Sequence, residues 1–164
     1  MEDKIGTMEA HSDWYNRTTK EINSHKDRLS QKEAKKYKLD LLLRITKRIE
    51  DFTSICGKCQ LSQQDITKLT QDLGYLVQIP NPNKETRKSY FKTIDDIIKH
   101  LQKEHKLVTE GQNRGKWVLV GMALSAAIGA VLDQPGVGTA IGVAIGLAIG
   151  SYMDKKAKEE GRII

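Results

Sequence analysis

Apolar residues recur at helical spacing through the first two thirds of the chain. In the clearest case the intervals are three and four residues, which places the side chains on one face of a helix: Leu42, Ile45, Ile49 and Phe52. The box Ser30-x-x-Glu33 is expected to begin this helix, because the two side chains satisfy each other's free backbone N–H groups. Gly57 is expected to end it.

Three further helices are predicted in the same region. A weakly amphipathic helix spans Asp13–Leu29, a second begins at Ser62 and stops at Gly74, and a third covers Lys84–Lys106. Residues 75–83 contain two prolines and no partner strand is visible, so they are expected to form an extended linker. The pattern therefore predicts a helical bundle over residues 13–110, preceded by a disordered segment, residues 1–12.

The pattern changes after residue 116. Residues 117–153 carry a single charge, Asp133, and are divided by Pro135-Gly136. Proline and glycine favour a turn, so the stretch is expected to form two helices, over residues 117–132 and 137–153, each about 24–26 Å long at 1.5 Å per residue. The predicted protein is all-α: a cytosolic helical bundle, a hinge at 111–116, a transmembrane helical hairpin at 117–153, and a charged cytosolic tail at 154–164.

Small residues form columns along both predicted arms. The second arm has glycine at every fourth position, and the first arm has a matching set of small residues: Gly138, Gly142, Gly146 and Gly150, facing Gly121, Ser125 and Gly129. Glycine columns let helix backbones approach closely in lipid, whereas in water each glycine costs a helix up to about 1 kcal/mol. A second column is expected to face a neighbouring copy: Ala140, Ala144 and Ala148.

Charges flank the hairpin on one side only. Arg114 and Lys116 precede the first arm, and Lys155, Lys156 and Lys158 follow the second. Basic residues favour the cytoplasmic face, so both termini are expected in the cytoplasm of a two-helix, multi-pass protein of the cell membrane.

The stretch GVGTAIGVAIGLAIGSYMDKKAKEEGR resembles the C-terminal unit of bacterial and archaeal glycine-zipper membrane proteins. CGKC followed by HLQKEHKLVTEG is similar to the front part of some longer members. The resemblance implies a membrane hairpin that self-associates into a homo-oligomer, and it implies no activity.

Composition separates the chain into a basic front and an apolar back. The 164 residues have a net charge of +6, and residues 117–164 hold four basic and four acidic side chains, so the whole excess precedes Trp117. The first 30 residues lack the apolar core of a signal peptide. No nucleophile arrangement, phosphate loop or dinucleotide fingerprint occurs, so the chain is not expected to be an enzyme.

Two cysteines and two histidines have the spacing of a structural zinc site: Cys56, Cys59, His100 and His105. Zinc, as cofactor, would help a domain with a small core. The histidines are five residues apart, so they converge only if the helix ends or tightens near Glu104. Two alternatives remain open at this point. The cysteines extend the apolar face of the helix that contains Phe52 and are then core residues, or they form a redox pair.

A set of basic residues lies on the helix that begins at Ser30: Lys32, Lys35, Lys36, Lys38, Lys47 and Arg48. It is either a solvated face or a contact for anionic lipid headgroups, and nucleic acid is less favoured because no aromatic platform accompanies it. His11 and His25 are expected to be solvated.

The favoured function is a non-enzymatic scaffold or interaction protein anchored in the lipid bilayer. The alternatives are an oligomeric pore or membrane-perturbing protein, whose polar residues would be Ser125, Thr139 and Ser151, and a soluble nucleic-acid-binding regulator with a buried hairpin.

Overall fold

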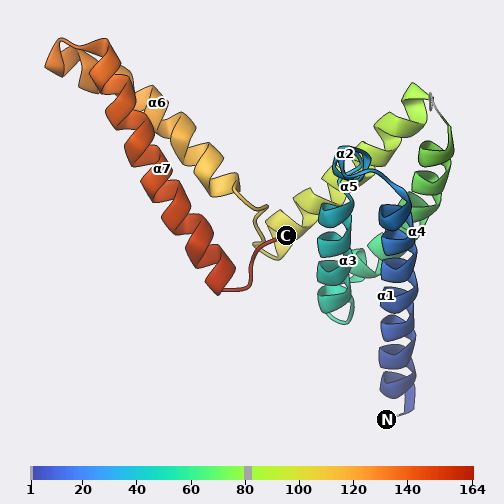
Figure 1. Cartoon of the computed structure of the whole chain (residues 1–164). Coiled ribbons are helices and arrows are strands. Elements are labelled where there is room, and N and C mark those ends of the chain that lie inside the picture. Colours follow the sequence, from blue (N-terminus) through green and yellow to red (C-terminus); the bar gives the residue numbers. More distant parts are fainter. Residues whose placement is uncertain (1, 80–82) are drawn as a thin grey trace. The chain divides into compact units, whose positions relative to one another are not determined.

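The computed structural model describes the backbone of residues 2–79 and 83–164 and the side chains of residues 13–79, 83–131 and 133–164. The regular elements of this part of the chain are helices, which confirms the predicted all-α class (Figure 1). The chain divides into two compact units, Met1–Glu104 and His105–Ile164.

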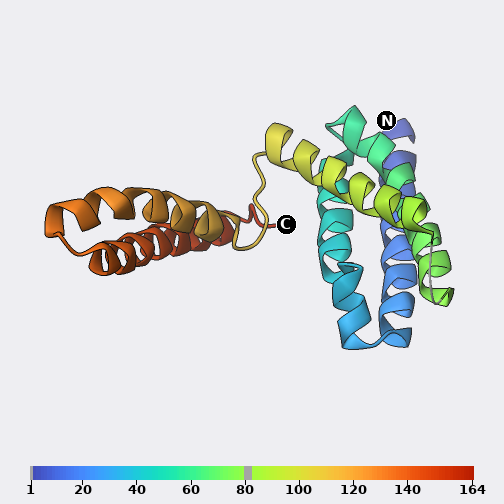
Figure 2. The same cartoon turned by 90° about the horizontal axis from the view of Figure 1, so that it is seen from above.

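Within the described residues, the first unit is a bundle of four long helices (Figures 1 and 2). These are α1 (Glu2–Arg28), α3 (Leu39–Thr53), α4 (Gly57–Gln78) and α5 (Lys84–Glu104), with the short α2 (Gln31–Lys36) between α1 and α3. Helix α3 contacts α1, α4 and α5. Side chains of the predicted apolar faces are fully buried: Ile22, Leu42, Ile45, Ile49, Ile66, Leu73, Tyr90, Ile94 and Leu101. Leu39 and Leu76, which lie outside the predicted faces, are buried as well.

Helix α1 begins at Glu2 and so includes residues 2–12, for which the sequence pattern predicted disorder. This segment contains no proline. Its first residues, Glu2 and Asp3, are acidic, and negative charge favours a helix N-terminus. Within the predicted segment Asp13–Leu29, Thr18 and Ile22 are buried in the bundle.

The predicted capping box is present at the start of α2. The N–H of Glu33 donates to Oγ of Ser30 at 3.3 Å, and the N–H of Ser30 donates to a carboxylate oxygen of Glu33 at 3.2 Å. The helix is shorter than predicted, because α2 ends at Lys36. Lys38 then adopts a left-handed conformation with φ of 55°, and α3 starts after it.

This interruption places Tyr37 in the core. The hydroxyl of Tyr37 donates to the carbonyl of Leu76 at 3.2 Å, and the carbonyl of Tyr37 accepts a hydrogen bond from the hydroxyl of Tyr90 at 3.0 Å. The two rings meet edge to face at 6.3 Å. A continuous helix would carry Tyr37 past these partners, so the packing of α4 and α5 explains why the helix breaks here.

The predicted limits of α4 are wrong at its N-terminus. Helix α3 ends at Thr53, and Gly57 begins α4 rather than ending the preceding helix. Ser62, the predicted cap, lies inside α4, where its hydroxyl donates to the carbonyl of Lys58 at 2.9 Å. A serine followed three residues later by an acid therefore occurs here without a helix end.

The predicted C-terminal stop is also wrong. Helix α4 continues through Gly74 to Gln78, so the first four residues of the expected linker are helical. A Cβ at Gly74 would lie 3.3 Å from Cε1 of His25, which shows that glycine there allows α1 to approach. Leu76 is buried and holds the last turn against the bundle. Residues 80–82 of the predicted linker lie outside the described residues.

The second unit is an antiparallel hairpin of α6 (Gln112–Leu132) and α7 (Pro135–Glu159) (Figures 1 and 2). The turn lies where Pro135-Gly136 predicted it, with Asp133 at φ of 54°. Both helices exceed the predicted arms. Most of the expected hinge, residues 111–116, belongs to α6, and the expected tail begins inside α7. At 1.5 Å per residue the helices are about 32 Å and about 38 Å long, which is enough for a hydrocarbon core of about 30 Å.

Polar contacts close the end of the hairpin opposite the turn. The carboxylate of Asp154 accepts hydrogen bonds from the backbone N–H groups of Asn113 and Arg114, each at 3.1 Å. These N–H groups belong to the first turn of α6, so an acid on α7 caps α6. Beside them, Val108 and Ile163 form an isolated parallel β-bridge.

Candidate functional site

The two cysteines lie at the N-terminus of α4. Cys56 is the residue that precedes the helix, with extended backbone angles, and Cys59 is in the first turn. Because α3 ends at Thr53, the cysteines do not continue its apolar face. The periodicity argument for two core cysteines is therefore wrong, although Cys59 itself is fully buried and Cys56 is half-buried.

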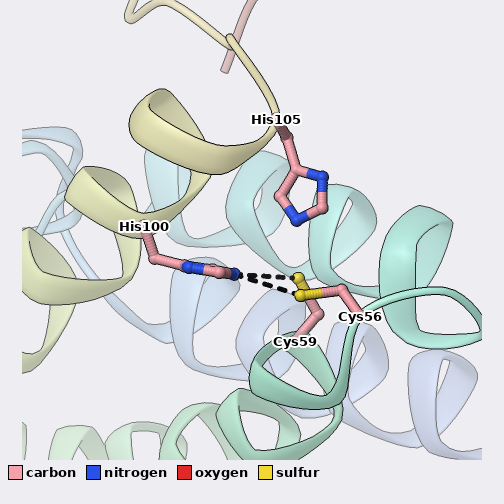
Figure 3. Close-up of side chains that lie close together, drawn as sticks. All are labelled: Cys56, Cys59, His100 and His105. Atoms are coloured by element: carbon pink, nitrogen blue, oxygen red, sulfur yellow. Dashed lines mark hydrogen bonds between the residues drawn. The ribbon is translucent and has the colours of Figure 1, made fainter.

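The two histidines lie at the end of α5. His100 is in the last turns of the helix and is buried. The helix ends at Glu104, and Lys106 has a φ of 54°. The condition that the sequence set for convergence, a helix end near Glu104, is therefore met, and the imidazole of His105 turns back toward the cysteines (Figure 3).

The four side chains converge on one point (Figure 3). Nε2 of His100 lies 3.4 Å from Sγ of Cys56 and 3.4 Å from Sγ of Cys59. One ligand atom from each of the four residues can be chosen so that all lie within 4.8 Å of one another. The structure thus brings together the four residues that the sequence proposed: Cys56, Cys59, His100 and His105.

These distances match the edges of a small coordination tetrahedron. In a tetrahedral zinc site the Zn–S bonds are about 2.3 Å and the Zn–N bonds about 2.0–2.1 Å, which gives S···N edges of about 3.5 Å. The two observed S···N separations of 3.4 Å are close to that value. Because all four ligand atoms lie within 4.8 Å of one another, inward movements of up to about 1 Å would close the tetrahedron.

The two thiols have different protonation behaviour. A hydrogen bond from the backbone of Cys59 lowers the pKa of Cys56, and the side chain of Cys59 and the backbone of Lys58 add to this effect, while burial opposes it. Burial raises the pKa of Cys59 to about 12, and the neighbouring Cys56 contributes to the rise. Cys56 therefore loses its proton at lower pH than Cys59.

The predicted glycine column lies inside the hairpin, against α6. A Cβ at Gly142 would be 2.3 Å from the carbonyl oxygen of Gly121, and a Cβ at Gly146 would be 2.2 Å from the carbonyl oxygen of Trp117. A Cβ at Gly138 would be 2.4 Å from the backbone nitrogen of Gly129. These separations are far below van der Waals contact, so the two backbones touch wherever the column runs.

Residues on the outside of the hairpin are large and apolar. The exposed members come from both helices: Leu119, Val120, Met122, Leu124, Val131, Val137, Ile141, Ile145, Leu147 and Ile149. The buried positions of the same helices include the glycines and Ser125. Ala140, Ala144 and Ala148, the predicted oligomer face, are exposed. Both helices are long and apolar enough to cross a membrane.

Two hydroxyl groups of the hairpin form hydrogen bonds within their own helices. Oγ of Ser125 donates to the carbonyl of Met122 at 2.6 Å, and Oγ1 of Thr139 donates to the carbonyl of Pro135 at 3.0 Å. Ser125 is buried between the helices, whereas Thr139 is exposed near the turn. Ser125 and Thr139 therefore do not form a continuous polar stripe in a single hairpin. A pore would need such a stripe to line its lumen.

Two further predictions concern histidines outside the cluster. His25, expected to be solvated, is half-buried and lies against Gly74. The side chain of His11 lies outside the described residues.

Most of the basic residues expected on the helix that begins at Ser30 are exposed: Lys32, Lys35, Lys36, Lys38 and Lys47.

Sequence reasoning missed the structural role of Asp154. The sequence pattern places Asp154 at the start of a charged tail, whereas in the structure it is buried and caps α6. The only sign in the sequence is that Asp154 directly follows the apolar run of the second arm. Its partners, Asn113 and Arg114, lie about forty residues earlier in the chain. Only the hairpin geometry joins the two.

Comparison with known proteins finds no matching family model, curated protein or solved structure. The resemblance to glycine-zipper membrane proteins therefore stays a prediction.

Proposed function

We propose that the protein is a non-enzymatic membrane protein in which the α6–α7 hairpin anchors a zinc-clipped helical domain with a scaffold or interaction role. The anchor rests on one observation: the hairpin is inverted relative to a soluble protein, with glycine inside and large aliphatic side chains outside. Water would oppose a continuous apolar surface of this kind. Lipid accepts it, because helices associate there through close packing rather than burial.

The same end of the hairpin carries the flanking charges. Asp154 contacts Asn113 and Arg114, so the start of α6 and the end of α7 lie together. Lys116, Lys155 and Lys158 belong to this end, and the turn at Asp133 lies at the other. Under the positive-inside rule both flanks are cytoplasmic and the turn is on the far side.

The proposed metal is zinc. Two thiolates and two imidazoles are the ligands of structural zinc, and a closed set of four protein ligands leaves no position for substrate. Zinc would join the N-terminus of α4 to the end of α5, two segments more than forty residues apart along the chain. Binding energy at such a site is folding energy for a small domain.

The resemblance to glycine-zipper proteins also implies self-association. The glycine column is occupied by α6, so a neighbouring copy would use the exposed face of Ala140, Ala144 and Ala148. Small residues on that face would let a second hairpin approach closely.

Membrane extraction tests the anchor. The full chain should stay with the membrane fraction after carbonate washing and should need detergent for solubility. Ile145→Lys places a charge on the exposed middle of α7 and should reduce insertion, since lysine at a helix centre costs about 2.5–3.5 kcal/mol. Ile55→Lys is the matched control, because Ile55 is an equally apolar, exposed side chain in the first unit. Recovery of the wild-type chain in the soluble fraction would refute the anchor and favour the soluble regulator.

Labelling tests the topology. Cysteines introduced at Lys116 and Lys158, in a background without Cys56 and Cys59, should react only when the inner side is opened. A cysteine at Gln134 should react from outside. Labelling of the two flanks from opposite sides would contradict the hairpin.

Metal analysis tests zinc. The detergent-purified chain should contain about one equivalent of zinc, and chelation should lower its helicity and melting temperature. His100→Ala should abolish the bound metal, whereas His25→Ala, a change at a half-buried histidine of the same bundle, should not. Metal-free wild-type protein that is indifferent to chelator would return the cysteines to a core or redox role.

A further inference from the structure

Five lysines gather around α2 at one end of the helical bundle. We name this group the α2 surface: Lys26, Lys32, Lys35, Lys36 and Lys38. Lys26 comes from the last turn of α1, the next three from α2, and Lys38 from the left-handed turn before α3. Figures 1 and 2 show α2 across the end of the α1–α3 pair. Three short segments therefore present their positive charges together.

The acidic groups within the α2 surface are already engaged. The carboxylate of Glu33 holds the Ser30 cap. The carboxylate of Asp40 accepts a hydrogen bond from Nζ of Lys26 at 2.6 Å. Lys32 and Lys35 have no ion pair within the described part of the chain. Nζ of Lys38 lies 4.0 Å from a carboxylate oxygen of Asp95. The surface thus keeps the unneutralised positive charge of Lys32 and Lys35 after these acids are counted.

A cleft runs through the same residues. It encloses about 720 Å³ and is open to solvent, and its lining is half lysine: Lys26, Lys32 and Lys35, with Gln31, Ala34 and Asp40. The ammonium groups of Lys32 and Lys35 line this cleft, which has room for an anionic group larger than a free inorganic ion. A phosphate with attached polar groups, as in a lipid headgroup, fits this combination of size and charge.

We propose that the α2 surface binds the phosphate groups of anionic membrane lipids. The inference rests on the proposed anchor, which would hold the domain next to a leaflet and make lipid phosphate the polyanion at highest local concentration. Each lysine near an anionic leaflet contributes about a fivefold gain in binding.

The local aromatic residues argue against nucleic acid as the occupant. Tyr37 is buried and bonded to Leu76, and Phe91 is half-buried beneath the ammonium group of Lys38. Single-stranded nucleic acid binds through exposed aromatic faces in addition to charge. At the α2 surface one of these rings is buried and the other is covered by Lys38, whereas a lipid headgroup needs only the charge.

Hydrogen exchange of the full chain in lipid nanodiscs tests the proposal. The discs contain phosphatidylcholine alone or phosphatidylcholine with phosphatidylglycerol, and the readout is exchange of the backbone amides of α2. We expect slower exchange in the anionic discs and reversal by high salt, because screening weakens contacts between exposed charges. Lys32→Gln combined with Lys35→Gln should reduce the difference in α2 exchange between the neutral and the anionic discs by about 25-fold, at about fivefold for each lysine.

A matched double variant controls for net charge. Lys92→Gln with Lys99→Gln removes two exposed lysines from α5 and should keep the lipid effect. Equal exchange of wild-type α2 in neutral and anionic discs would overturn the proposal. So would equal protection in neutral discs by inorganic phosphate or by an RNA oligonucleotide, which would assign the surface to a soluble anion or to nucleic acid. A chain that does not enter the discs refutes the anchor instead, and the same comparison with anionic vesicles then decides the lipid contact.

Discussion

Gly142 is the position where the packing of the hairpin can be tested with a single methyl group. In Gly142→Ala the new Cβ would lie 2.3 Å from the carbonyl oxygen of Gly121 and 2.9 Å from Cβ of Ser125. Ordinary contact begins at 3.4 Å, so the methyl group is too close to the carbonyl by about 1 Å. The carbonyl belongs to the backbone of α6 and cannot rotate away. The helices must therefore separate.

The cost follows from that separation. A gap of 0.5–1 Å removes about a quarter to a half of the attraction between each pair of atoms that were in contact. Overpacked positions typically lose about 1–3 kcal/mol. Alanine also favours the helix over glycine by up to about 1 kcal/mol. The two effects oppose each other, so the measurement needs a glycine in the hairpin where only the helix preference acts.

Gly115 supplies that control. It lies in α6, and a Cβ there would meet no atom within 4 Å. We expect Gly115→Ala to keep or raise the melting temperature of the chain in detergent, followed by circular dichroism. Gly142→Ala should be less stable than Gly115→Ala by about 1–3 kcal/mol, and spin labels on the two helices should move apart. Equal stability of the two variants would refute close backbone contact as the basis of the hairpin.

Three other outcomes are expected. Zinc affinity should rise with pH between neutral and mildly alkaline conditions, because the pKa of Cys59 is raised to about 12 and the metal must displace its proton; a pH-independent titration would contradict this. Asp154→Ala should destabilise the hairpin by about 1–3 kcal/mol through loss of two charge-assisted hydrogen bonds, whereas Glu159→Ala, at an exposed site, should not; equal melting of the two variants would remove the cap. Ala144→Leu should leave insertion intact but reduce crosslinked oligomers, and an unchanged oligomer distribution would rule out this face.

Some parts of the fold could be predicted from the sequence because they depend on interactions between neighbouring residues. The apolar face through Leu42, Ile45 and Ile49 is buried, and the Ser30–Glu33 capping box forms. The turn at Pro135 divides the apolar stretch as expected. Each of these features depends on residues within a few positions of one another, so the sequence contains the whole cause.

Helix limits were harder to predict, because they depend on distant partners. Gly74 lies inside α4 since α1 brings His25 against it, and its glycine is a packing residue rather than a stop. The helix beginning at Ser30 breaks at Lys38 because Tyr37 bonds to Leu76 and Tyr90. A local pattern cannot distinguish a glycine that ends a helix from one that admits a neighbour.

The metal cluster shows both kinds of cause together. Residue type and spacing were sufficient to nominate Cys56, Cys59, His100 and His105, because few other ligands of this kind occur in the chain. Whether they meet depended on two helix ends, α3 at Thr53 and α5 at Glu104, and on packing that joins the start of α4 to the end of α5. The residue types in the sequence identified the ligands, and tertiary contacts between segments more than forty residues apart set the distances between them. Sequence spacing determines the distance between two side chains only within a few turns of one helix.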